Sequence, residues 1–93
     1  MACNGYRNVE TWKFMIYFED FLCETLLEQY DEKELDYKTV HDTVKYFIDE
    51  MRDGADKNIV GSSFLNEIIN EYLNEIDLEG VVNNIAHAIG VSE

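Results

Sequence analysis

The chain contains no proline among its 93 residues, and its apolar residues recur at intervals of three and four over most of its length. Proline is the residue that most strongly interrupts a helix, and this spacing places apolar side chains along one helical face. The sequence therefore predicts an all-α fold, a compact bundle of four to five helices in a single domain that spans residues 1–93. Residues 1–7 precede the first periodic segment and are expected to be flexible.

Residues that favour helix N-termini mark the expected helix starts. Asn8, Asp36 and Asp77 each precede an apolar periodic segment, and Ser62 or Ser63 precedes another. Their side-chain oxygens can accept the backbone N–H groups that the first turn of a helix leaves unpaired. A helix is therefore expected after each of these positions.

The segment 9–30 is apolar around most of its circumference and is expected to be the central element of the bundle. The sequence leaves open whether it forms one helix or two helices joined at Glu19 and Asp20. Gly54 and Gly90 are expected to end later helices, because glycine readily adopts the left-handed conformation that follows many helices. In the segment 9–30 and in the helix before Asp77, the apolar side chains expected to face inward are Phe21, Leu22, Leu26, Leu27, Tyr30, Phe64, Leu65, Ile68, Ile69, Tyr72, Leu73 and Ile76.

Acidic residues far outnumber basic ones, with 20 Asp and Glu against 7 Lys and Arg and a net charge of −13. No basic residue follows Lys57. Such a charge repels nucleic acid and anionic membranes and attracts basic proteins. We therefore expect the chain to bind neither nucleic acid nor membrane directly, and we expect its partner to be a basic protein. An acidic surface also promotes solubility, and composition leaves these two interpretations open.

The acids form two series with a spacing of four residues, which we call the N-terminal ladder (Asp20, Glu24, Glu28 and Glu32) and the C-terminal ladder (Glu67, Glu71 and Glu75). In a helix, like charges at this spacing are neighbours and cost about 0.2–0.5 kcal/mol per pair. The C-terminal ladder is expected opposite the apolar stripe of its helix, as on an ordinary solvent face. The residues predicted to contact a basic partner are Asp20, Glu24, Glu28, Asp31, Glu32, Glu34, Asp36, Glu67, Glu71 and Glu75, and the region 19–36 is the stronger candidate.

Aromatic residues cluster in the first predicted helix and just before it: Tyr6, Trp12, Phe14, Tyr17, Phe18 and Phe21. Most are expected in the core, but one helix cannot easily bury all of them in a domain of this size. The excess predicts a docking patch or the seam of a homodimer, with Trp12 and Tyr17 as its contacts.

No catalytic pattern is present, and the sequence predicts neither an enzyme nor a cofactor. His41 and His87 have no cysteine or serine placed by sequence to form a nucleophile–base pair. The segment 1–5 lacks the features of a signal peptide, and the longest apolar run, Phe14–Phe18, is too short to cross a bilayer. A cytoplasmic protein with reduced thiols at Cys3 and Cys23 is therefore expected.

The segment 56–67 partly matches an EF-hand calcium loop. Asp56, Asn58 and Glu67 occupy positions one, three and twelve, where side-chain oxygens bind calcium, and Gly61 occupies position six. Val60, at position five, offers no side-chain oxygen, which should weaken binding strongly. No metal site is therefore predicted, and this loop is a weak calcium candidate.

The opening Asn8-x-Glu10-Thr11-Trp12 resembles the start of small acidic proteins of unknown function from phages and other mobile elements. The segment Ser63–Ile85 is similar to their ends, an amphipathic helix followed by an acidic cap and a short helix. The resemblance implies a mobile-element origin and assigns no catalytic residues. In size and charge the chain is also similar to anti-CRISPR and anti-restriction inhibitors, many of which occupy nucleic-acid-binding surfaces.

Two functional hypotheses follow from these observations. The first is a DNA mimic, a non-enzymatic inhibitor in the host cytoplasm that binds a basic, nucleic-acid-binding surface of a host defence nuclease through the two ladders. The second is a protein–protein interaction module or homodimeric adaptor that uses its aromatic patch.

Overall fold

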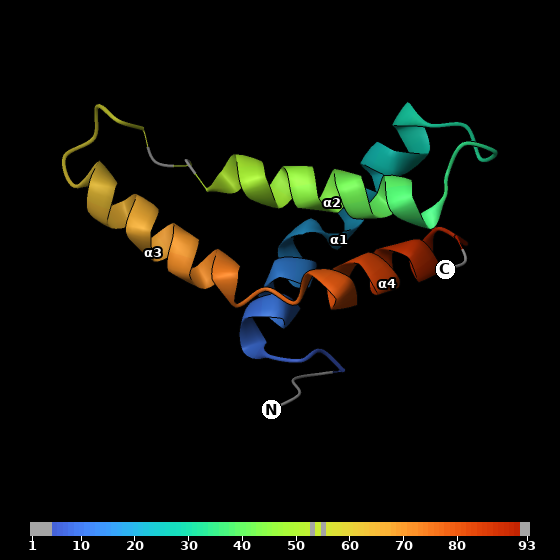
Figure 1. The fold of residues 1–93 in the computed structure, drawn as a ribbon, viewed down its shortest axis with the longest axis horizontal. Helices are drawn as coiled ribbons and strands as arrows, with labels where there is room; N and C mark the ends of the chain where they lie inside the picture. Colours follow the sequence, from blue (N-terminus) through green and yellow to red (C-terminus); the bar gives the residue numbers. More distant parts are fainter. Residues whose placement is uncertain (1–4, 53, 55, 92–93) are drawn as a thin grey trace.

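In the computed structural model, which describes residues 5–52, 54 and 56–91, the chain is all-helical, as predicted. The helices of this part of the chain are α1 (Val9–Gln29), α2 (Tyr37–Met51), α3 (Ser62–Asn74) and α4 (Leu78–Ala88) (Figure 1). The segment 9–29 is one continuous helix through Glu19 and Asp20, so there are four helices rather than five. The expected flexibility of residues 1–7 falls in part on residues 1–4, which lie outside the described residues.

The predicted N-caps of three helices are confirmed. Asn8, Asp36 and Asp77 begin α1, α2 and α4, and each side-chain oxygen accepts the backbone N–H of the residue three positions later, at 2.8, 2.8 and 3.2 Å. Gly90 follows the C-cap of α4 with a φ of 81°, the left-handed turn that its position predicted. These boundaries are set by contacts within one helical turn.

Two other predicted boundaries are wrong. Neither Ser62 nor Ser63 caps α3, because Gly61 takes the N-cap position with a φ of 82° and Ser62 is already the first helical residue. Gly54 does not directly follow the C-cap of α2. Arg52 is the C-cap of α2, so the position after the cap lies outside the described residues.

The core lies where α1, α2 and α4 pack against one another. Its most deeply buried apolar side chains are Leu22 and Leu26 from α1, Val40 and Val44 from α2, and Val81, Val82 and Ile85 from α4. Burial of such side chains stabilises a fold by about 1.5–3 kcal/mol each. Thr11 is the buried polar residue among them, and its Oγ1 accepts the Asp77 N–H at 2.9 Å, which joins the start of α1 to the start of α4.

The helix α3 extends away from these three packed helices (Figure 1). Leu73 is its buried residue. Polar bonds attach it to the end of α2: the Arg52 guanidinium donates to Asn70 Oδ1 at 3.2 Å and to Asn74 Oδ1 at 3.0 Å, and Asn70 Nδ2 donates to the Arg52 carbonyl at 2.9 Å. The attachment of α3 is therefore partly polar, unlike the packing of α1, α2 and α4.

Part of the apolar stripe of α3 faces solvent, so the predicted inward orientation is wrong for those residues, whereas Ile69, Leu73 and Ile76 pack against the core as predicted. Phe64 is 66% exposed and Ile68 47%, and Leu65 and Tyr72 are also exposed. On α1, Phe21 and Leu27 are each 53% exposed, against the same prediction. The reason is geometric, because α1, α2 and α4 complete the core and only the C-terminal part of α3 reaches it.

The molecule is thin and extended, with principal extents of 46 × 32 × 18 Å. Its radius of gyration is 14.4 Å, whereas a compact domain of this length has about 12 Å. Its accessible surface is 6538 Å², against about 5,600 Å² for a compact monomer of the same mass.

Candidate functional site

The ion pairs of the described residues all lie on α2 and its C-cap. Their members are Lys38 and Asp42 at 3.1 Å, Lys45 and Asp49 at 2.8 Å, and Arg52 and Asp49 at 3.4 Å, and His41 Nδ1 lies at hydrogen-bond distance, 3.2 Å, from Asp42 Oδ1. A hydrogen bond with His41 and one from Lys38 hold the pKa of Asp42 below its usual value. Lys45, and then Arg52, do the same for the pKa of Asp49. Much of the scarce positive charge is therefore already paired within this one helix.

The two ladders, in contrast, have no basic partner. All seven of their carboxylates are exposed, and none forms an ion pair within the described part of the chain. Asp20, Glu24 and Glu28 lie on α1, whereas Glu32 follows the end of that helix. Only three members of the N-terminal ladder are therefore stacked at helical spacing.

Three other residues predicted to contact the partner, Asp31, Glu34 and Asp36, differ in their roles. The carbonyl of Asp31 accepts the N–H of Glu34 at 2.8 Å, so both residues form the turn after α1 and are exposed. Asp36 is the N-cap of α2, and the hydrogen bond from the Thr39 N–H lowers its pKa. The Asp36 carboxylate is exposed, but it is already engaged in holding a helix start.

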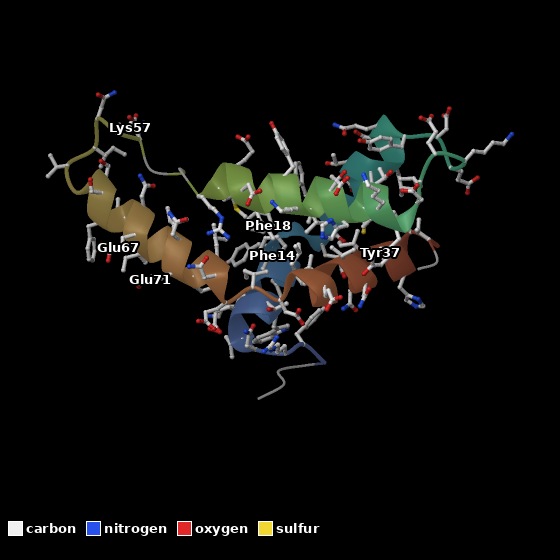
Figure 2. All side chains as sticks on the ribbon, viewed as in Figure 1. Phe14, Phe18, Tyr37, Lys57, Glu67 and Glu71 are labelled. Carbon is white, nitrogen blue, oxygen red and sulfur yellow. The ribbon has the colours of Figure 1, made fainter. Side chains whose placement is uncertain are left out.

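The C-terminal ladder was expected opposite the apolar stripe of α3. It lies instead beside the exposed part of that stripe. An α-helix turns by about 100° per residue, which places Glu67, Glu71 and Glu75 roughly a quarter turn from Leu65, Ile68 and Tyr72. Glu67 and Glu71 lie on the side of α3 that is turned away from α2 (Figure 2). This surface therefore combines unpaired carboxylates with solvent-exposed apolar side chains.

The outer side of α1 has the same mixed character. Ile16 is 61% exposed, and Phe21 and Leu27 are exposed beside it. On the helix, these residues flank Asp20 and Glu24 of the N-terminal ladder. Both ladders are thus bordered by apolar side chains, which is the composition of a protein-binding surface more than of a purely solvated one.

An apolar pocket of about 250 Å³ lies between α1, the end of α2 and the end of α3, and its lining residues are Lys13, Phe14, Tyr17, Phe18, Met51, Tyr72 and Leu73. Tyr17 was a predicted contact and is 77% exposed. Tyr72 was missed because its position in the apolar stripe suggested a core residue. Trp12, the other predicted aromatic contact, is half-buried and lies outside the pocket lining.

The floor of this pocket belongs to an aromatic cluster. Phe14 and Phe18 are 5.1 Å apart between ring centroids, and Phe18 and Phe47 of α2 are 5.0 Å apart. Figure 2 shows Phe14 and Phe18 on α1, close to α2. Aromatic pairs at such distances stabilise by about 0.5–1.5 kcal/mol beyond their burial, so the floor is held firmly in place.

The described residues contain no group of three or more His, Cys, Asp or Glu side chains that could hold a metal ion. In the weak calcium candidate, Asp56 Oδ1 accepts the Asn58 N–H at 2.9 Å, and Glu67 is exposed on α3. The calcium interpretation stays a prediction. Cys23 is half-buried, and burial followed by repulsion from Glu19 and Asp20 raises its pKa, which disfavours a reactive thiolate.

No helix of the described residues is long and apolar enough to cross a membrane. No protein-family model, curated protein or solved structure matches this chain.

Proposed function

We propose that this protein is a non-enzymatic inhibitor that binds a basic surface of another protein through its two ladders. The observation that carries the proposal is the separation of charge. Lys38, Lys45 and Arg52 are paired on α2, while both ladders are left exposed without a basic partner among the described residues. Repulsion along each ladder costs stability, and a basic partner would turn that cost into attraction.

The target surface we propose is the nucleic-acid-binding groove of a host defence nuclease. Such grooves present Lys and Arg to a chain of phosphates that rises about 3.4 Å per nucleotide. Carboxylates four residues apart in an α-helix, about 6 Å along the axis, likewise present regularly spaced negative charge. The resemblance of the chain to small phage-borne acidic proteins, and its likeness in size and charge to anti-CRISPR inhibitors, support this target.

Affinity capture from a bacterial lysate tests the ladder mechanism. The wild-type protein is expected to retain a nucleic-acid-binding protein at 50 mM NaCl and to release it on addition of duplex DNA or 500 mM NaCl. Neutralising two ladder residues, Glu67→Gln with Glu71→Gln, should weaken this capture several-fold. The matched control, Asp42→Asn with Asp49→Asn, removes the same charge from α2 and should leave capture nearly unchanged.

Equal capture by the ladder variant and the wild type, with the same salt dependence, would show that the C-terminal ladder does not bind the partner. Loss of capture in the control as well would show that only net charge matters. Capture that duplex DNA does not reverse would place the partner's contact outside its nucleic-acid-binding groove.

The second hypothesis, an apolar interaction module or homodimer, is favoured by a different observation. The exposed aromatic and aliphatic side chains of α1 and α3 accompany a surface larger than a compact monomer needs. Sedimentation of the pure protein tests the homodimer directly. In this alternative, Tyr17→Ala or Trp12→Ala should reduce association while ladder changes have little effect.

A further inference from the structure

We infer that the pocket between Tyr17 and Tyr72 receives an apolar side chain from a basic segment of the partner. This anchor would fix the position of the bound segment along the ladders. The inference rests on the proposed function, because it names the chemistry of the segment that the ladders attract. The occupant would be a peptide segment with one leucine-like or aromatic side chain flanked by Lys or Arg.

The size and lining of the pocket fit such an anchor. A volume of about 250 Å³ falls below the usual range of about 300–1,000 Å³ for small-molecule sites. The lining is apolar except for Lys13 and the two tyrosine hydroxyls. Anchors of protein interfaces commonly occupy desolvated pockets of this kind, surrounded by contacts of lower energy.

The charges around the pocket select a basic segment. Burial raises the pKa of the Tyr72 phenol. The charge of the nearby Glu10 carboxylate raises this pKa further, and Tyr17 adds to it. Lys13 is the basic residue of the lining. The Lys13 side chain can pack its stem against the apolar walls of the pocket while its ammonium group stays in water.

A second copy of this chain fits the pocket less well. Each copy carries a net charge of −13, so two copies repel each other on approach. Like charges placed opposite each other cost energy across an interface, whereas Lys and Arg of a basic segment would neutralise them. The charge pattern therefore favours a different, basic protein as the occupant.

Two synthetic peptides of equal charge and length test the inference. One is an amphipathic Lys–Leu peptide, and the other replaces each leucine with alanine. Their affinities for the full-length protein are measured by calorimetry in 50 mM NaCl. Burial of one leucine side chain in place of alanine predicts at least about tenfold tighter binding of the Lys–Leu peptide.

Variants locate this preference in the pocket. Tyr72→Ala removes one wall and should reduce the preference to about twofold, whereas Phe64→Ala, also an exposed aromatic of α3, lies outside the lining and should retain it. Both variants are checked for wild-type helicity by circular dichroism. Amide-shift mapping of the bound peptide should show its largest changes at Lys13, Tyr17 and Tyr72.

Each outcome has a distinct meaning. Equal binding of the two peptides, or an unchanged preference in Tyr72→Ala, overturns the anchor while leaving ladder-driven binding in place. Failure of both peptides to bind at low salt overturns the anchor and contradicts the proposed function as well. Sedimentation of the pure protein as a dimer that Tyr72→Ala dissociates would assign the pocket to a second copy instead.

Discussion

Neutralising the middle residue of the C-terminal ladder should stabilise the protein, although it should weaken binding. Glu71 has a like-charged neighbour one turn away on each side, and it lies in the last turn of α3, which contains no basic residue. Glu71→Gln removes two repulsive pairs of about 0.2–0.5 kcal/mol each and an unfavourable interaction with the helix dipole. Glutamine has nearly the helix propensity of glutamate, so the expected gain is about 0.5–1.5 kcal/mol.

Thermal unfolding followed by circular dichroism measures this gain. In 20 mM NaCl the melting temperature of Glu71→Gln should rise by roughly 2–12 °C, because a domain of this size gains about 4–8 °C per kcal/mol. Glu67→Gln, which removes one repulsive pair farther from the helix end, should give about half the effect. In 500 mM NaCl both gains should shrink towards zero, because the screening length falls to a few ångströms. A destabilised Glu71→Gln protein, or a gain that salt does not reduce, would refute the account of unpaired, repelling carboxylates.

Three further predictions concern the fold. Thr11→Val should lower the free energy of unfolding in urea by about 1–3 kcal/mol, because the Asp77 N–H loses its acceptor, while Thr11→Ser keeps the acceptor and should lose less. Gly90→Ala should lower the same quantity by about 1–2 kcal/mol, since alanine is strained in the left-handed conformation. The hydrogen bond from the Thr39 N–H lowers the pKa of Asp36 in the folded protein. The stability that this cap contributes is therefore fully present above the unfolded pKa of about 3.9. It is lost as the pH falls through the lower pKa of the folded state. In acid titrations from pH 5 to 2, Asp36→Asn should therefore lose less stability than the wild type, and equal losses would contradict this role of Asp36.

The helix starts were predictable because their causes are local. Asn8, Asp36 and Asp77 each form a hydrogen bond that spans three residues, so the sequence contains both partners. The start of α3 was not predictable in the same way. There the backbone of Gly61 takes the cap position without any side-chain hydrogen bond, and the adjacent serines misled the prediction.

The candidate site was predictable only in part. Spacing and composition pointed to the exposed ladders and to Tyr17, because charge and helical period are properties of the sequence. The exposure of Phe64 and Tyr72 was not predictable, since periodicity defines an apolar face but does not say which element covers it. Long-range packing decides that question, and here α1, α2 and α4 complete the core without most of α3.

The polar attachment of α3 has a consequence for how this protein would meet its partner. Hydrogen bonds between Arg52, Asn70 and Asn74 can be exchanged for bonds to water, whereas the buried contacts of the core cannot. We therefore expect most of α3 to open locally more readily than α1, α2 and α4, which share the buried core. Such a helix can adjust its angle to the partner, and the loss of that freedom on binding lowers the affinity that the complex can reach.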